Sequence, residues 1–288
     1  MLSTAARPYG SVPARYAALL APPRRSKHFE YIINYYRTYA SIFDYPKSDK
    51  QIGTLDNVGG QGCTNVLYGY GKKIYWIVAG KHKIAEFRVP KKPIKTLSDS
   101  VGAPSSCAMN GSGDLAVGIL DGPGGGDIVI FKDASAPGTV MTTSLTEEFF
   151  DGYDDKGNLF ADGYNGSHSF ELIELPSGSS TFQTITTSNT VEFPGSVQWD
   201  GRYLTVTDQG NEEIYQYAVS GTKATLKGTV SLTASGDCAQ TWIAKGVVFC
   251  ADAGNGDGEV FNYPAGGPPV AVLTGNFDFP LGTVAVSR

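Results

Sequence analysis

The stretch VFNYPAGG (260–267) decides the fold, because a close copy of it, IFDYPKS (42–48), stands near the other end of the chain. Four related phrases lie between these two. The equivalent positions of the six copies are Pro46, Pro90, Ala134, Pro176, Ser220 and Pro264, which gives intervals of 44, 44, 42, 44 and 44 residues. Six copies at so even a spacing indicate a repeat protein with a unit of about 43 residues.

Each repeat contains short segments with the composition of β-strands. KIYWIVAG (73–80) and VVFCADA (247–253) lie upstream of a repeated phrase, and FQTITTS (182–188) lies downstream of one. β-Branched and aromatic residues dominate these segments, and Gly, Asp, Asn or Pro bound them. A fourth segment precedes most copies and ends in a glycine that suits a tight hairpin turn, as in VQWDG (197–201). Each repeat therefore predicts four antiparallel strands.

These patterns predict an all-β fold, a six-bladed β-propeller with four-stranded antiparallel blades. The first repeat begins at its second strand, so its innermost strand has to come from elsewhere. The segment LGTVAVSR (281–288) fits that place, and it would close the ring by completing the first blade. Closure of this kind removes exposed strand edges. We therefore expect that loss of the last eight residues unfolds the protein and that loss of the first 25 is tolerated.

The Tyr-Pro phrases themselves are expected to be structural. Proline cannot donate to a ladder, so it ends the third strand before the turn to the outermost one. Aromatic residues in these phrases alternate with polar ones, which predicts that one face packs against the neighbouring blade. The aromatic residues in question are Phe43, Tyr45, Phe87, Phe131, Tyr217, Phe261 and Tyr263.

The charge distribution separates a basic leader from an acidic body. The chain has 288 residues and a net charge of −5. Residues 1–27 hold five Lys or Arg and no acid, so the remainder has 18 basic against 28 acidic residues and carries −10. An acidic body disfavours a nucleic-acid partner. We expect residues 1–27 to be a flexible or processed leader, without a convincing signal peptide, and residues 28–288 to form a single domain. No apolar run is long enough for a transmembrane helix.

The four cysteines do not form a zinc-binding pattern, because no C-x-x-C spacing occurs. Cys63 and Cys107 occupy equivalent positions of neighbouring blades, so a disulfide between them is conceivable. Equivalent strands of adjacent blades are usually too far apart for one. Buried free thiols are therefore the expectation for Cys63 and Cys107, and the sequence does not decide the thiol or disulfide state of the four cysteines.

The blade pattern resembles a known superfamily. GNLFADGY (157–164), PGSVQWDGRYLTV (194–206), VFNYPAGG (260–267) and PLGTVAVS (280–287) are similar to the blades of bacterial NHL-repeat and gluconolactonase-like propellers. This resemblance implies the propeller fold and an exported protein. Members of the superfamily include proteins of unknown role, metal-dependent lactonases and an antibiotic-cleaving lyase. None of their functional motifs matches here at a clear position, so the resemblance assigns no site residue.

Ligands of propellers usually meet the face that is built by the loops entering the first strand and leaving the second strand of each blade. At the first-strand positions the chain offers Cys63, Cys107, Asp151, Ser196 and Gln240. At the ends of second strands it offers acidic, Gly-rich loops on four consecutive blades. These loops contribute Asp121, Asp127, Asp162, His168, Asp208, Asn211, Glu212, Asp252, Asn255, Asp257 and Glu259. Such oxygen ligands suit Ca²⁺ or hydrogen bonding to a glycan or peptide, but Asp and Gly are also what tight turns require.

Two functions compete on this basis. The first is a non-catalytic binding propeller, monomeric and secreted or envelope-associated, that takes a small molecule, glycan or peptide at the channel mouth. Its candidate ligand-binding residues are Asp121, Asp151, Asp162, His168, Asp208, Asn211, Gln240, Asp252 and Asn255, and Tyr153, Tyr164, Trp199 and Trp242 supply aromatic surface.

The second is a lactonase-like hydrolase or a lyase that depends on Ca²⁺ or another divalent metal. Its candidates are Asp151, Asp208, Asp252 and His168. Three histidines exclude a His-rich metal centre. No nucleophile elbow and no Cys–His pair is present, so no residue is assigned as catalytic, and the binding protein is the preferred hypothesis.

Overall fold

The repeated segments form antiparallel strands in the computed structural model, which describes residues 28–36, 38–56, 58–78, 83–88, 92–98 and 101–287. The expected leader (1–27) and His82 lie outside the described residues. Within them the strands make four separate four-stranded sheets and one eight-stranded sheet, and one short 3₁₀ turn, η1 (Lys132–Ala134), accompanies them. No helix among these residues has the length and apolar character needed to cross a membrane. The all-β prediction is confirmed.

The strands of each sheet are adjacent in the sequence, with one exception at the chain ends. Given from the centre of the ring outward, the sheet that holds both ends is β24 (Pro280–Ser287), β1 (His28–Asn34), β2 (Tyr39–Phe43) and β3 (Gly53–Asp56). The next two sheets are β4 (Gly62–Thr64), β5 (Lys73–Val78), β6 (Lys83–Arg88) and β7 (Lys92–Ser98), and β8 (Pro104–Met109), β9 (Leu115–Ile119), β10 (Ile128–Phe131) and β11 (Thr139–Met141).

The eight-stranded sheet contains two runs of four antiparallel strands. These are β12 (Glu147–Tyr153), β13 (Leu159–Tyr164), β14 (Phe170–Leu175) and β15 (Gln183–Thr187), and β16 (Pro194–Trp199), β17 (Leu204–Asp208), β18 (Glu213–Ser220) and β19 (Lys223–Ser231). Two parallel residue pairs between β15 and β19, the outermost strands of the two runs, join them. The last sheet is β20 (Cys238–Ala244), β21 (Val247–Asp252), β22 (Asp257–Asn262) and β23 (Ala271–Leu273).

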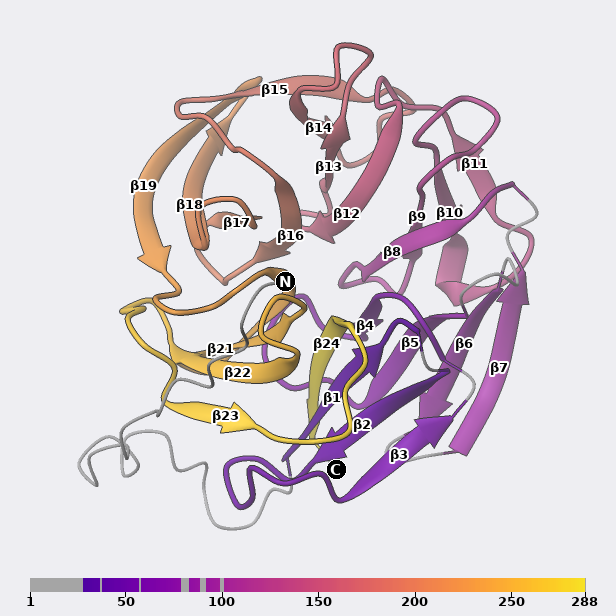
Figure 1. Ribbon diagram of the computed structural model, residues 1–288. Coiled ribbons are helices and arrows are strands. Elements are labelled where there is room, and N and C mark those ends of the chain that lie inside the picture. The colour runs from indigo at the N-terminus through magenta and orange to yellow at the C-terminus, as the bar shows by residue number, and fades with distance from the viewer. Residues whose placement is uncertain are drawn as a thin grey trace.

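The sheets stand around a common centre as in a propeller. Figure 1 shows β8, β12, β16 and β24 near the centre and β3, β7, β11, β15, β19 and β23 around the outside. The expected pairing of the two chain ends is confirmed, because β24 pairs antiparallel with β1 from His28↔Ser287 to Asn34↔Pro280. The ring is thus closed by the C-terminal strand.

The hairpin glycines behave as the sequence predicts. The four that end the innermost hairpins, Gly113, Gly157, Gly201 and Gly246, all have a positive φ, between 83° and 99°. This is a region that other residues rarely enter. The turns therefore set where each inner strand reverses into the second strand of its sheet.

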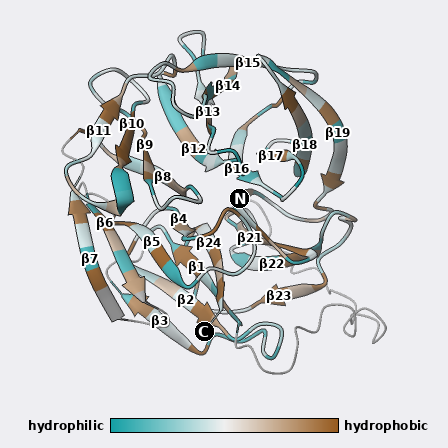
Figure 2. Ribbon diagram, turned by 180° about the vertical axis from the view of Figure 1, so that it is seen from behind, coloured by the Kyte–Doolittle hydropathy of each residue, from teal (hydrophilic) through white to brown (hydrophobic). Residues whose placement is uncertain are grey.

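The core lies between neighbouring sheets. Phe43 and Tyr45 pack with Trp242 and Phe249 of the β20–β23 sheet, and the rings of Tyr45 and Phe249 meet edge to face at 5.5 Å. Phe131 likewise packs in a cluster drawn from the β4–β7 and β8–β11 sheets. Figure 2 shows the brown, hydrophobic β10 and the teal that marks polar residues on β12. The expectation that the repeated aromatic residues pack between sheets is confirmed.

The inner strands approach one another closely, and one consequence corrects the prediction for the cysteines. A Cβ on Gly152 of β12 would lie 2.3 Å from the carbonyl oxygen of Val197 on β16, so only glycine fits there. On β4 and β8 the same crowding brings the Cα atoms of Cys63 and Cys107 to 5.6 Å, and the two form a disulfide. That distance is typical of disulfides.

The other two cysteines also form a disulfide. Cys238 on β20 and Cys250 on β21 belong to neighbouring antiparallel strands and have Cα atoms 5.4 Å apart. The expectation of free thiols was wrong for Cys63 and Cys107. It underestimated how far a propeller narrows toward its axis, and it did not consider cysteines within one hairpin.

Candidate functional site

A narrow cavity of about 30 Å³, called the inner cavity here, lies between the inner strands. All five residues that the sequence placed at equivalent first-strand positions line it, namely Cys63, Cys107, Asp151, Ser196 and Gln240. The repeat register therefore predicted correctly which residues meet near the axis. Most of these side chains, however, are engaged in contacts that hold the inner strands together.

Gln240 ties three inner strands together. Its amide nitrogen donates to the carbonyl oxygen of Gly62 at 2.8 Å, and its amide oxygen accepts from the N–H groups of Gly62 and Thr283. The side chain is buried and so joins β20 to β4 and β24 at the closure of the ring. This candidate residue is engaged in structural hydrogen bonds.

The segment from Asn65 to Gly71, called the plug here, covers one end of the cavity. Gln198 of β16 donates to the carbonyl oxygen of Leu67 at 3.1 Å, and the indole N–H of Trp242 donates to that of Gly69 at 2.7 Å. The N–H group of Gly69 in turn donates to the carbonyl oxygen of Ile243. The plug follows β4, so it lies at the end of the inner strands away from their starting points, which form the mouth.

A group of buried carboxyl groups lies on β12 and β13. Glu148 is fully buried and accepts hydrogen bonds from the hydroxyl groups of Ser105 and Ser106, the latter at 2.8 Å. Asp151 and Asp162 are buried beside it. Their carboxylate oxygens accept no hydrogen bond of ordinary geometry from the described residues. Two of the sequence candidates therefore meet here, together with a glutamate that the sequence analysis did not single out.

Burial determines the protonation of this group. Burial raises the pKa of Glu148 to about 7, against the lowering effect of the two serine hydroxyls. Burial raises the pKa of Asp151 as well, and the charge of Glu148 adds to that effect. The pKa of Asp162 is raised by burial first and by Glu148 next. Like charges enclosed together cannot all ionise, so burial and mutual repulsion both favour the protonated forms of these groups.

The stability of the protein should therefore depend on pH. The pKa of Glu148 is raised from 4.5 to about 7 on folding, so the folded state holds a proton that the unfolded state has already released. Stability is full below about pH 4.5 and is lost as pH rises toward 7, by roughly 3 kcal/mol for this group. We expect urea titrations to give a higher free energy of unfolding at pH 5 than at pH 8.

Replacing the acid by its amide isolates this effect. Glu148→Gln cannot ionise, so it should be more stable than the wild type at pH 8 and show a smaller decrease between pH 5 and pH 8. Glu192→Gln, at an exposed glutamate on the same face, is the matched control and should leave the decrease unchanged. If the free energy of unfolding of Glu148→Gln decreases between pH 5 and pH 8 as much as that of the wild type, Glu148 ionises normally in the folded protein.

The ends of the second strands form turns in which the acids bind backbone groups. The carboxylate of Asp208 accepts from the N–H groups of Glu192, Phe193 and Gly210 and from the side chain of Asn211. Each of these bonds lies within the strand connections of one sheet. The carboxylate of Asp208 and the amide of Asn211 thus fix the loop that enters β16.

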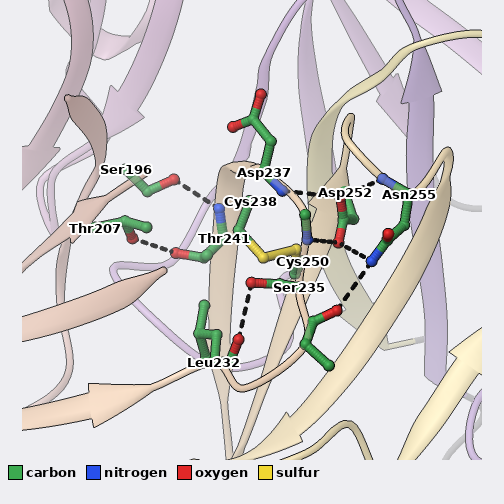
Figure 3. Close-up of a disulfide and its surroundings, with 12 residues drawn as sticks. Ser196, Thr207, Leu232, Ser235, Asp237, Cys238, Thr241, Cys250, Asp252 and Asn255 are labelled. Atoms are coloured by element: carbon green, nitrogen blue, oxygen red, sulfur yellow. Dashed lines mark hydrogen bonds between the residues drawn. A yellow bond between two sulfur atoms is a disulfide. The ribbon is translucent and has the colours of Figure 1, made fainter. Parts of the chain in front are cut away.

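The next sheet repeats the arrangement. Asp252 accepts from the N–H groups of Gly236, Asp237 and Asn255 and from the Asn255 amide, and Figure 3 shows these bonds beside the Cys238–Cys250 disulfide. The interpretation of these residues as turn formers therefore accounts for their contacts.

The remaining two candidates lie on the surface. Asp121 is exposed, and its carboxylate accepts from the N–H of Ala103 at 3.4 Å. His168 is exposed, and its ring packs on Tyr164 with centroids 4.2 Å apart. Neither residue therefore belongs to the group of buried acids.

One group of potential metal ligands comes together among the described residues. Cys238, Cys250, Asp252 and Glu259 each place one donor atom within 4.8 Å of the others. The two sulfur atoms are joined to each other, and Asp252 is engaged by backbone N–H groups. Burial, with the nearby charge of Asp252, raises the pKa of Glu259 to about 9. This donor set does not suit a divalent cation, which needs deprotonated ligands.

A hollow on the mouth face forms a cavity of about 350 Å³, called the mouth cavity here. Loops that enter inner strands and loops that leave second strands line it, as the sequence analysis expected for a ligand site. Its wall is mostly apolar and includes Tyr35, Ile77, Pro104, Leu120, Phe149, Phe150, Phe193, Phe279 and Leu281. Its polar residues are Gln61, Ser105, Gln209 and Asp237.

Exposed aromatic rings surround the mouth cavity in two groups. Tyr35 and Tyr36 pack on Phe279, with Tyr36 and Phe279 at 5.5 Å between ring centroids. Phe149, Phe193 and Tyr164 form the second group, with pairs at 5.3 and 6.1 Å. Phe193 and Phe279 remain 38% and 41% exposed. Large apolar side chains left partly exposed in a concavity are typical of a binding site.

The aromatic residues named from the sequence divide between the two ends of the inner strands. Tyr164 belongs to the mouth group, but Tyr153, Trp199 and Trp242 end β12, β16 and β20 or lie near their ends, and they line the inner cavity. Placing all four on one face was wrong for these three. An inner strand runs from the mouth toward the plug, so its last residues lie on the far side.

The mouth aromatics carried a sequence signal that was not used. Phe193-Pro194 and Phe279-Pro280 stand at the same position of two repeats, where each inner strand begins. Pro104 begins β8 in the same way. A recurrent X-Pro pair before the inner strand therefore marks the mouth.

Comparison with known proteins supports the fold and no more. No family model and no curated protein matches the chain. A protein of unknown function from Bacteroides caccae is similar over 91% of this chain and 99% of its own, with a TM-score of 0.66 and 12% identity. A chain from a nidogen/laminin complex is similar over 90% of this chain and 98% of its own, with a TM-score of 0.67 and 10% identity.

A putative 6-phosphogluconolactonase from Bacteroides fragilis is also similar in structure. The likeness covers 92% of this chain and 100% of that one, with a TM-score of 0.56 and 13% identity. Identities this low establish a shared architecture, and function has to be argued from the site. The chain is a β-propeller.

Proposed function

We propose that the protein is a non-catalytic, six-bladed propeller of the NHL-repeat and gluconolactonase-like kind that binds a small ligand with an apolar body in its mouth cavity. The two halves of the eight-stranded sheet, counted separately, bring the number of four-stranded units to six, which matches the six sequence repeats. The observation that carries the binding function is the aromatic wall of the mouth cavity.

The alternative of a metal-dependent hydrolase or lyase is less well supported. Of its four candidate residues, Asp208 and Asp252 are saturated by backbone N–H groups. Asp151 is enclosed with a raised pKa, and His168 packs on Tyr164 at the surface. Turn formation and burial thus occupy the groups that such an enzyme would need to keep free.

We also propose that the protein is exported and monomeric. Two buried disulfides support export, because disulfides persist in oxidising compartments. Closure of the ring by β24 supports a monomer, because it leaves no inner strand edge for a second copy to pair with.

A neutral fluorescent probe tests the binding function. N-Phenyl-1-naphthylamine should bind saturably to the wild type, and Phe193→Ala with Phe279→Ala should weaken its binding at least tenfold. The physical reason is that burying one large apolar side chain against a ligand is worth on the order of 1.5–3 kcal/mol. Fluorescence titration measures the dissociation constant.

Tyr68→Ala is the matched control for this titration, because Tyr68 is an exposed aromatic residue on the plug, at the opposite face. It should bind the probe as the wild type does. Unsaturable binding, or an equal decrease of affinity in Tyr68→Ala, would rule out the mouth cavity as the binding site.

A further inference from the structure

Two of the four polar residues that line the mouth cavity, Gln61 and Asp237, each have a buried acceptor oxygen without a partner among the described residues. Gln61 is 6% exposed, and its amide nitrogen donates to the carbonyl oxygen of Phe149 at 3.2 Å. Its amide oxygen is buried and accepts no hydrogen bond from the described residues. Gln61 lines both the mouth cavity and the inner cavity. It therefore forms the floor between the two.

Asp237 supplies a second acceptor of this kind. One of its carboxylate oxygens is buried and has no hydrogen-bond partner among the described residues. Its backbone N–H donates to Asp252, and Figure 3 shows its carboxylate pointing away from Asp252 and from the disulfide. Burial raises the pKa of Asp237, and the charges of Asp252 and Glu212 add to this effect. Burial and these neighbouring charges therefore disfavour the ionised form of the carboxyl group unless a positive charge binds beside it.

A buried acceptor without a donor lowers the stability of the folded protein, so such an acceptor in a cavity indicates that a bound ligand supplies the donor. A ligand that satisfies both acceptors has to donate hydrogen bonds, and one that compensates Asp237 has to carry positive charge. Aromatic rings attract cations through their faces, and five aromatic residues line this cavity, Tyr35, Phe149, Phe150, Phe193 and Phe279.

We infer that the mouth cavity selects a small organic cation, an alkylammonium group attached to an apolar or aromatic body. The ammonium group donates to Asp237 and to the amide oxygen of Gln61, and the apolar body packs on the aromatic wall. This inference rests on the proposed binding function and adds the charge and the donor character of the ligand.

Three probes of nearly the same shape separate charge from apolar contact. Phenethylamine is cationic at pH 7, 2-phenylethanol is neutral and 3-phenylpropionate is anionic. Titration calorimetry of the wild-type protein should show phenethylamine binding at least tenfold more tightly than 2-phenylethanol, with 3-phenylpropionate weakest. Equal binding of the amine and the alcohol, or binding of neither, would overturn the inference.

A substitution then assigns the preference to one group. Asp237→Asn keeps the size of the side chain and removes its charge, so it should reduce the preference for the amine about tenfold while leaving the affinity for the alcohol unchanged. Asp155→Asn is the matched control, because this exposed aspartate is not part of the cavity wall. An unchanged preference in Asp237→Asn would remove Asp237 from the site.

The experiments distinguish failure of the binding function from failure of the selection for a cation. If the cavity binds N-phenyl-1-naphthylamine and 2-phenylethanol but shows no preference for the amine, the binding function stands and selection for a cation is wrong. If none of these probes binds, the mouth cavity is not a ligand site. The thermal unfolding of Asp237→Asn should match that of the wild type, which separates loss of the charge from loss of the fold.

Discussion

Removal of residues 280–288, which include the whole of β24 (Pro280–Ser287), is expected to abolish cooperative folding. Val284, Ala285 and Val286 are fully buried in the core between the first and last sheets. The strand supplies the entire ladder on the inner edge of β1. Without it, β1 presents an unpaired hydrophobic edge, which templates aggregation. Circular dichroism and size-exclusion chromatography of the truncated protein should show no cooperative melt and a predominantly aggregated state.

Two substitutions within the strand provide the matched comparison. Val284→Lys places a charge in the core and should reproduce much of the destabilisation, because a buried unpaired charge costs several kcal/mol. Ser287→Lys, at the partly exposed end of β24, should leave the melting temperature nearly unchanged. A truncated protein that melts cooperatively near the wild-type temperature would show that the ring does not need its closing strand.

Loss of the Cys63–Cys107 disulfide is expected to lower the free energy of unfolding by about 4 kcal/mol, on the loop-entropy account of disulfide stabilisation. The two cysteines are 44 residues apart, and they join inner strands of neighbouring sheets. A loop of that length leaves the unfolded chain much freer once the bond is absent. Urea denaturation of the Cys63→Ala, Cys107→Ala double variant measures the change.

The second disulfide is the internal comparison. Cys238 and Cys250 are only 12 residues apart and lie in one hairpin. Their double alanine variant should lose about 3 kcal/mol by the same account. A larger decrease for the hairpin pair than for the pair between sheets would contradict the expected order and would place the stabilisation in the folded state.

The fold was predictable because its signals are local and repeated. Three signals recur in the repeats: alternation of apolar and polar residues, turn glycines such as Gly201, and proline after the third strand. Because the pattern recurs in six copies, an irregularity in one copy does not obscure it. The missing strand of the first repeat then implied that residues 281–288 pair with the start of the domain. That pairing is observed between β24 and β1.

The candidate site was much less predictable, because the same residue type can either bind a ligand or stabilise a turn. Asp at the end of a second strand looks like a ligand in the sequence, yet Asp208 and Asp252 bind the N–H groups of their own turns and of the loops that enter the inner strands. What a carboxylate contacts depends on how the next loop folds over it. Composition does not contain that information.

The mouth wall escaped prediction for a different reason. Tyr35 and Phe279 adjoin the paired end strands β1 and β24, whereas Phe149 and Phe193 belong to the eight-stranded sheet, so the two groups meet only after the ring has closed. The partners of Cys63 depend on the same closure, since the spacing of inner strands is a property of the whole ring. Features that depend on contacts between several blades cannot be predicted from the sequence pattern of a single repeat.

The plug has a kinetic consequence for any ligand. Because Gln198 and Trp242 hold the plug across the far end of the inner cavity, a molecule that enters at the mouth has to leave by the same opening. Arrival and departure then cross a single barrier formed by the aromatic rim. A change in the rim that only raises this barrier slows both steps by the same factor, which lengthens the residence time of the ligand without altering its equilibrium affinity.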